Sequence, residues 1–196
     1  MEKMIWLIFM AFIATSSGCD YYARNKVIVI QPLGSFPSGL TQHVYKQLKK
    51  INPTTIIRQP IALPAEAYYA QRKRYRADSL IRYLGRHIGS DTIVIGITDK
   101  DISTTKGAVA DWGVMGLGYC PGRSCVVSTY RLSQKDLPTQ FYKVAIHELG
   151  HTQGLPHCAE KTCFMRDAEG GNPLNEEYRF CASCKTYLTR RGWKLR

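Results

Sequence analysis

The sequence has few acidic residues, no long hydrophobic run and no internal repeat. Asp and Glu number 15 against 27 Lys and Arg, so the formal net charge is +12. This surplus favours acidic partners such as nucleic acid or anionic lipid, but it does not indicate a fold. The longest apolar run, residues 4–14, is too short to cross a bilayer as a helix, which takes about 20 residues. With 44% hydrophobic and 21% charged residues in 196, the sequence excludes a multi-span membrane protein, a fibrous repeat and a disordered chain.

The N-terminal segment is typical of an export signal. Lys3 precedes the apolar run, whose length fits the hydrophobic region of a signal peptide. Small residues then lead to Cys19, in a sequence that resembles a bacterial lipobox, where the chain is cut before the cysteine and the thiol is acylated. We therefore expect residues 1–18 to be a lipoprotein signal peptide. Residues 19–196 would form a single domain, exported and anchored to the membrane through a lipid on Cys19. An ordinary secretory signal is the alternative, because Ser16 stands where a lipobox has Leu.

The order of hydrophobic patterns predicts an α/β fold. Runs rich in β-branched residues predict strands at 26–30, 54–58, 92–97 and 124–130. Apolar residues at helical spacing predict helices over 38–51, 76–88 and 138–152. Alternation of strands with helices favours a mostly parallel sheet. Residues 107–122 are rich in glycine and indicate turns, and the chain beyond residue 155 indicates cysteine-rich loops.

Residues 147–157 follow the pattern His-Glu-x-x-His-x-x-Gly-x-x-His. Histidines four apart on a helix project from one face, so His147 and His151 can both bind one zinc ion at about 2.0–2.1 Å. Gly154 lets the backbone turn, so that His157 can return as the third ligand. Three imidazoles leave the fourth position for water, as in a catalytic zinc site. Glu148 is then predicted to take the proton of that water as the general base.

Six further cysteines follow Cys19 along the chain. In an oxidising compartment, disulfides are the first expectation for them. The close pairing of Cys158 with Cys163 and of Cys181 with Cys184 instead fits a tetrahedral zinc site of four thiolates. Two disulfides, or an exposed redox Cys-x-x-Cys, remain as alternatives. Residues 120 and 125 form either one local disulfide or two free thiols.

The complete string of motifs resembles the archaemetzincins, a family of metzincin metalloproteases. The resemblance rests on the zinc motif, the cysteine directly after His157, Cys-Phe-Met at 163–165 and Cys-x-x-Cys at 181–184. It implies that Cys158, Cys163, Cys181 and Cys184 hold a second, structural zinc ion, and that Met165 packs beneath the catalytic metal. The implied fold is α/β: a twisted mixed sheet with helices and an antiparallel edge strand, a catalytic zinc helix, and a C-terminal cysteine-rich subdomain stapled by zinc.

We therefore expect a zinc-dependent peptidase with two zinc ions per chain, acting as a monomer on peptide or protein substrates. An extended substrate is expected to pair with the strand at 124–130 by β-augmentation. Nucleic acid is not an expected partner. The alternative is a catalytically silent zinc-binding protein that uses the metzincin scaffold and a basic surface for interaction. Glu148 favours the enzyme, because zinc binding alone does not require it.

Overall fold

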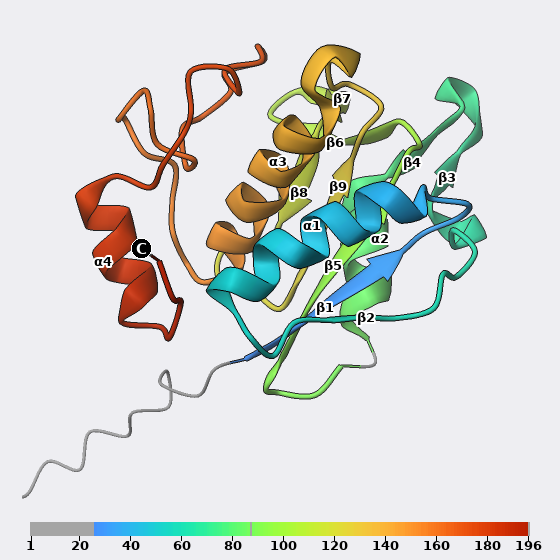
Figure 1. Cartoon of the computed structure of the whole chain (residues 1–196). Coiled ribbons are helices and arrows are strands. Elements are labelled where there is room, and N and C mark those ends of the chain that lie inside the picture. The colour runs from blue at the N-terminus through green and yellow to red at the C-terminus, as the bar shows by residue number, and fades with distance from the viewer. Residues whose placement is uncertain (1–25, 87, 196) are drawn as a thin grey trace, which may run out of the picture.

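A twisted mixed sheet forms the centre of the molecule (Figure 1). The computed structural model describes residues 26–86 and 88–195, so the expected signal peptide and Cys19 lie outside the described residues. The central sheet contains, in order, β2 (Ile56–Ile57), β1 (Val27–Pro32), β5 (Thr92–Thr98), β9 (Ser124–Ser128) and β8 (Gly116–Gly118). The first four strands are parallel, and β8 is antiparallel to β9 at the edge. The predicted α/β class and antiparallel edge strand are therefore confirmed.

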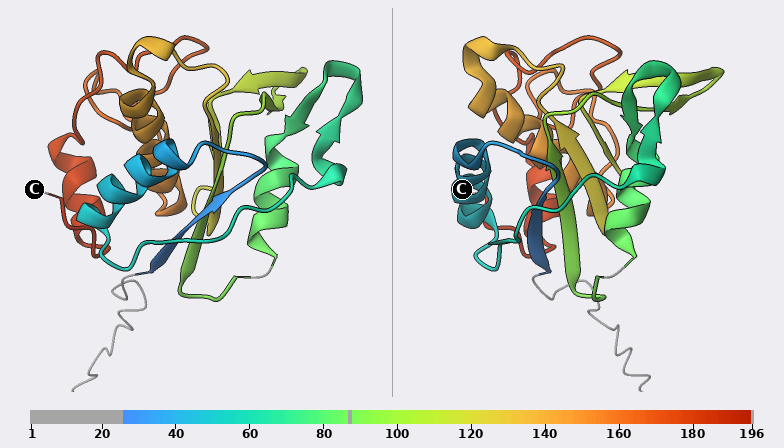
Figure 2. Two further views of the ribbon diagram at one scale, coloured as in Figure 1. Left: turned by 45° about the vertical axis from the view of Figure 1, so that its right-hand side comes forward. Right: turned by 90° about the vertical axis from the view of Figure 1, so that its right-hand side faces the viewer.

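Three helices cover the two faces of this sheet (Figure 2). They are α1 (Ser38–Ile51), α2 (Ala77–Gly85) and α3 (Leu137–Thr152), close to the predicted bounds. Side chains alternate across each strand. Ile28 and Ile30 of β1 therefore pack in the core beneath α1 and α3, whereas Val29 packs in the core beneath α2. Because both faces are covered, the central strands are almost continuously apolar, which made them recognisable in the sequence.

A second sheet of four strands was not predicted. It contains β3 (Tyr68–Tyr69), β4 (Arg74–Arg76), β6 (Ile102–Lys106) and β7 (Val109–Val114), in that order. Asp101, just before β6, forms two ion pairs. Its Oδ2 lies 3.0 Å from Arg74 Nε, and its Oδ1 lies 2.8 Å from Arg131 Nη2. These ion pairs join β4 and the segment after β9 to the base of the β6–β7 hairpin. Short helical turns η1 (Ala65–Ala67), η2 (Ala70–Arg72) and η3 (Gln134–Asp136) connect the elements.

The C-terminal segment packs onto the same core as α1 and α3. It contains a helix that was not predicted, α4 (Ala182–Thr189), where the sequence had indicated only loops. Leu188 and Trp193 are buried in the core cluster with Phe180, and the amide of Lys194 donates to the carbonyl of Ile51 at 2.9 Å. Among the residues that the structure describes, no helix is both long and apolar enough to cross a membrane.

The core predicts opposite effects for the same substitution at two glycines. A Cβ on Gly96 of β5 would lie 2.6 Å from Leu84 Cδ1 and 3.1 Å from Leu33 Cδ1, and both leucines are buried. Gly96→Ala should therefore lower the free energy of unfolding by about 1–3 kcal/mol. A Cβ on Gly39 of α1 meets nothing within 4 Å, so Gly39→Ala should raise it by about 0.5 kcal/mol. Urea denaturation at one fixed zinc concentration measures both. Equal effects of the two substitutions would contradict this account of the core.

Candidate metal centre

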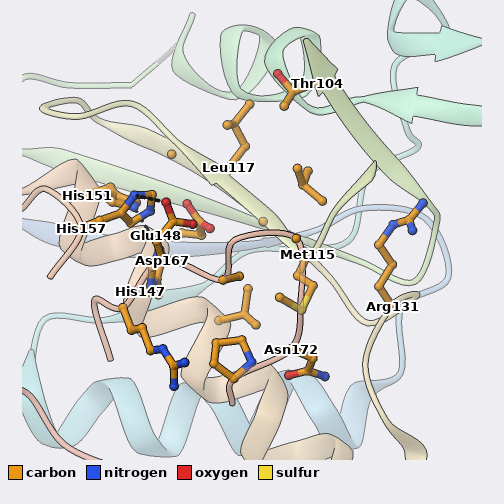
Figure 3. Close-up of a pocket in the computed structure, with 18 of the residues that line it drawn as sticks. Thr104, Met115, Leu117, Arg131, His147, Glu148, His151, His157, Asp167 and Asn172 are labelled. Atoms are coloured by element: carbon orange, nitrogen blue, oxygen red, sulfur yellow. Dashed lines mark hydrogen bonds and ion pairs between the residues drawn. The ribbon is translucent and has the colours of Figure 1, made fainter. Parts of the chain in front are cut away.

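The three predicted histidine ligands converge on one point at the C-terminal end of α3 (Figure 3). His147 and His151 lie one turn apart on the same face of the helix. Gly154 has a φ of 91°, a left-handed conformation that favours glycine, and it turns the chain at the end of α3. His157 thereby returns to the other two, and one ring nitrogen from each histidine lies within 4.8 Å of the others.

The hydrogen bonds of the imidazoles favour a cation between them. His147 Nδ1 lies 2.7 Å from the carbonyl oxygen of Phe164, and His151 Nδ1 lies 2.7 Å from that of Leu155. Since a carbonyl oxygen only accepts hydrogen bonds, each Nδ1 carries the proton, and the Nε2 of each neutral ring has a lone pair free to bind a metal. These two Nε2 atoms face one another at 3.0 Å. Two nitrogens bound tetrahedrally to one zinc ion at about 2.0–2.1 Å would lie about 3.3 Å apart. The donor set therefore fits zinc.

Burial keeps two of these imidazoles neutral, as a metal ligand must be. Burial, reinforced by the nearby His151 ring, lowers the pKa of His147 to about 3. Burial also lowers the pKa of His151 below its ordinary value. The rings therefore offer lone pairs at neutral pH instead of repelling a cation.

The third predicted ligand, His157, has a carboxylate partner that the sequence did not reveal. Asp167 Oδ2 lies 3.2 Å from His157 Nδ1. The backbone amide of Glu169 lowers the pKa of Asp167, and the nearby His157 ring acts in the same direction. A carboxylate on the far nitrogen of a histidine ligand fixes the orientation of the ring and its tautomer. Asp167 follows Met165 by two residues, but no spacing rule in the sequence indicated this contact.

The predicted general base is enclosed by the edge strand. A Cβ on Gly116 would lie 2.6 Å from Glu148 Cγ, and one on Gly118 would lie 3.2 Å from Glu148 Oε2. The strand can approach α3 this closely because it has glycine at both positions. Burial raises the pKa of Glu148 to about 8. Burial therefore makes the Glu148 carboxylate more basic than that of an exposed glutamate.

Four cysteines form a second cluster in the C-terminal segment. Their sulfur atoms, from Cys158, Cys163, Cys181 and Cys184, all lie within 4.8 Å of one another. Cys158 Sγ and Cys181 Sγ are 3.7 Å apart. Sulfurs bound tetrahedrally to one zinc ion at about 2.3 Å lie about 3.8 Å apart, whereas a disulfide bond is about 2.05 Å long. The cluster therefore fits zinc better than the two disulfides that the sequence left open.

The thiols of the cluster differ in acidity. Burial raises the pKa of Cys163 and Cys184. Burial acts in the same direction on Cys181, but hydrogen bonds with Ser183 and Cys184 outweigh it and lower the pKa of Cys181 to about 6. The remaining cysteines of the described chain, at positions 120 and 125, are two free thiols in this structure, one exposed and one buried.

Met165, which the resemblance places beneath the catalytic metal, lies against α3 at Gly150, between the two histidines. A Cβ on Gly150 would lie 2.5 Å from Met165 Sδ. Met165 is fully buried and belongs to the same core cluster as Leu149 and Leu155. It supports the part of α3 that carries the proposed ligands.

A cavity of about 650 Å³ opens beside the histidines and Glu148. Its walls come from β6, β7, β8, α3 and the segment 166–177. Trp112 of β7 and Gly170 both line the cavity and lie side by side, since a Cβ added to Gly170 would lie 3.2 Å from Trp112 Cζ2. Figure 3 shows Met115 and Leu117 on the wall across from the histidines.

The expected docking strand was wrong. β9, the strand predicted at 124–130, pairs with β5 on one side and with β8 on the other, so its backbone is already occupied. The sheet ends at β8, and Gly116, Leu117 and Gly118 of this strand line the cavity. The free sheet edge that faces the candidate site therefore belongs to β8.

Comparison with known proteins agrees with this geometry. The family model described as Peptidase family M54 matches residues 29–190. The chain is 30% identical over 170 residues to the archaemetzincin of Haloarcula marismortui, covering 80% of this chain and 95% of that protein. It is 31% identical over 165 residues to the archaemetzincin of Methanopyrus kandleri, covering 82% of this chain and 90% of that protein.

Solved structures show the same likeness. The crystal structure of the archaemetzincin from Methanopyrus kandleri matches with a TM-score of 0.72 at 27% identity, covering 85% of this chain and 96% of that one. The archaemetzincin from Archaeoglobus fulgidus, complexed with malonate, matches with a TM-score of 0.70 at 28% identity, covering 82% and 99%. The chain therefore belongs to peptidase family M54 and is a zinc metallopeptidase of the archaemetzincin type.

Proposed function

We propose that this metallopeptidase hydrolyses peptide bonds at a zinc ion held by His147, His151 and His157, with Glu148 as the general base. The observation that carries the proposal is the convergence of three imidazole nitrogens within 4.8 Å, next to a buried carboxylate that is not in the ligand set. A protein that only stored zinc would have no use for that carboxylate.

The chemistry divides between the metal and the protein. A zinc ion supplies Lewis acidity when bound, because it lowers the pKa of a coordinated water to about 7 and polarises a carbonyl oxygen. Glu148 accepts a proton from the attacking water, whose oxygen forms a bond to the scissile carbonyl carbon. Glu148 then delivers the proton to the leaving amine nitrogen as the C–N bond breaks. Asp167 meanwhile keeps the His157 ring in place.

The edge of β8 is the proposed docking site for the substrate backbone. An extended peptide there would continue the central sheet by one strand, with its main chain paired to residues 115–118. Glu148 lies directly against Gly116 and Gly118, so a peptide on this edge passes beside the base. Because all proposed ligands come from one chain, we propose that the enzyme acts as a monomer.

We propose a second, structural zinc ion at the four cysteines, which gives two ions per chain. The separation of 3.7 Å between Cys158 Sγ and Cys181 Sγ supports a tetrahedral thiolate site. With four protein ligands, such a site has no open position, so it would contribute to stability and not to catalysis.

Glu148 and His151 should separate catalysis from metal binding. Glu148→Gln keeps the size of the side chain against Gly116, so the protein should retain two zinc ions while kcat falls by about 10²–10⁴-fold. His151→Ala removes a ligand, so it should lose one zinc ion together with activity. Peptide cleavage and elemental analysis of the same samples give both quantities.

These outcomes discriminate between the alternatives. Full activity in Glu148→Gln would refute the mechanism, even though the family assignment would stand. Fewer than two zinc ions in the wild type would refute the second site, and mass spectrometry can show whether its cysteines are in disulfides instead. A wild type with two zinc ions that cleaves nothing in a broad peptide library would favour a silent binding protein.

Asp167 is expected to affect zinc affinity at the histidine site and not the stability of the fold. Asp167→Asn removes the charge behind His157 on a half-exposed side chain, so thermal stability of the apoprotein should not change. Zinc affinity at the histidine site should fall by about 10–100-fold, the usual effect of removing such a partner. Competition with a zinc chelator measures the affinity. Unchanged chelator competition would mean that Asp167 plays no part in holding the metal.

We also propose export and membrane anchoring through a lipid on Cys19. Support comes from the apolar run at 4–14 and the small residues before Cys19. A lipid and a net charge of +12 would both attract the protein to an anionic bilayer. Together they would bind it more stably than a single acyl chain does. Wild type expressed in a bacterium should fractionate with membranes, whereas Cys19→Ser should be released or left unprocessed. If both forms fractionate alike and keep residues 1–18, the lipoprotein hypothesis is wrong.

A further inference from the structure

The wall of the catalytic cavity contains a buried carboxylate that the mechanism does not use. Glu177 lines the cavity and is only 2% exposed. Its Oε2 atom is buried and has no hydrogen-bond partner among the described residues. Burying a polar atom without a hydrogen-bond partner costs free energy. A ligand in the cavity that bonds to this carboxylate would remove that cost.

The two cations near Glu177, Lys143 and Arg166, bond to other groups in the structure. Lys143 on α3 donates to the carbonyl of Leu174 at 2.6 Å. Arg166 pairs with the neighbouring Glu176, also at 2.6 Å. Neither group donates a hydrogen bond to the buried Oε2 atom of Glu177 in the structure, although both lower the pKa of its carboxyl from a longer distance. The other acidic residues of the wall have other roles, because Glu148 is the proposed base and Asp167 pairs with His157.

The surroundings of Glu177 suit a long side chain with a charged tip. Val144, Pro173 and Leu174 line the same cavity and are buried and apolar. Val144 lies one helical turn before Glu148 on α3, so this part of the wall is next to the reacting centre. Lysine and arginine bury their alkyl stems on apolar surface while the cationic head reaches a polar group.

We propose that Glu177 gives the enzyme a preference for lysine or arginine in the substrate residue that binds next to the scissile bond. This inference rests on the proposed peptidase function and names its substrate class. The alkyl stem would lie along Val144 and Leu174, and the cationic head would pair with Glu177. The substrate would thus supply the partner that the protein itself does not.

The pH dependence follows from the state of the carboxylate. Burial raises the pKa of Glu177 to about 7, although Lys143 and Arg166 act in the opposite direction and Glu176 adds to the rise. Below that pH the group is neutral, and above it the group is charged. Preference for a cationic side chain should therefore grow between pH 6 and pH 8. A ratio of two substrates isolates this effect, because both share the catalytic groups.

The test uses matched peptides that carry lysine, its neutral analogue norleucine or glutamate at each of the two residues flanking the scissile bond. At pH 8 the zinc-loaded wild type should cleave the lysine peptide with a kcat/KM about 10–100-fold above that of the norleucine peptide, at one of the two positions. Glu177→Gln should lower kcat/KM for the lysine peptide until the ratio lies within about threefold of one. This variant breaks no hydrogen bond of Oε2 in the structure, so it should fold.

Glu169→Gln is the matched control. It removes the same charge from the same segment, but Glu169 is exposed at the surface, so the ratio should stay at the wild-type value. If Glu169→Gln abolished the preference as Glu177→Gln does, the effect would be one of net charge, and the subsite at Glu177 would be refuted. A wild-type ratio near one at both positions would refute it without any variant.

A binding measurement separates the failure of this inference from that of the proposed function. The same peptides can be titrated into zinc-loaded Glu148→Gln protein, which should bind without turnover. Selective binding of the lysine peptide with no cleavage by the wild type would refute the peptidase mechanism and support the subsite. Cleavage and binding of lysine and norleucine peptides to equal extents would refute the subsite and leave the peptidase standing.

Discussion

The close approach of α3 to the segments on either side of it is the constraint on which the site depends. Toward the sheet edge, glycine at positions 116 and 118 lets β8 lie against Glu148. On another side of α3, Gly150 leaves room for the sulfur of Met165 between the turns that carry His147 and His151. A side chain at position 116 or 118 would push β8 away from α3, and one at position 150 would displace Met165. The proposed general base, the proposed metal ligands and the proposed substrate edge are therefore all positioned by one close-packed arrangement.

The electrostatics of the site follow from the same packing. Exclusion of water keeps His147 and His151 neutral and makes Glu148 a stronger base than an exposed glutamate. The carbonyls of Phe164 and Leu155 accept hydrogen bonds from Nδ1 of His147 and of His151. The unprotonated Nε2 atoms of both rings therefore point to the same place. A cation between these lone pairs relieves their repulsion, so metal binding should be stronger in this arrangement than in a flexible one.

The sequence predicted the parts of the fold and site that depend on local periodicity, and it missed those that depend on contacts between distant segments. The central strands, the three long helices and the metal motif have clear periods or fixed ligand spacings. Strands β4 and β6 are short and polar, and ion pairs to Asp101 help to hold them. Helix α4 buries only Cys184 and Leu188, too few positions for a visible stripe. The strand at 124–130 was recognised, but its neighbours in the sheet were not. The substrate was therefore expected on a strand whose two edges are both already paired.

The two proposed metal sites are joined by the backbone between them, so each should depend on the other to a different extent. Cys158 directly follows His157, and its amide donates to the carbonyl of Met165 at 2.8 Å. Cys163 directly precedes Phe164, whose carbonyl accepts from His147. A metal ion at the cysteines would therefore fix the segment 157–167. This segment contains the proposed ligand His157, the Phe164 carbonyl that accepts from His147, and Met165 and Asp167. The histidine site, by contrast, contributes no residue to the cysteine cluster. Losing the cysteine site should disorder the catalytic centre, whereas losing a histidine should leave the cysteine site intact, because only the first change releases the backbone on which both depend.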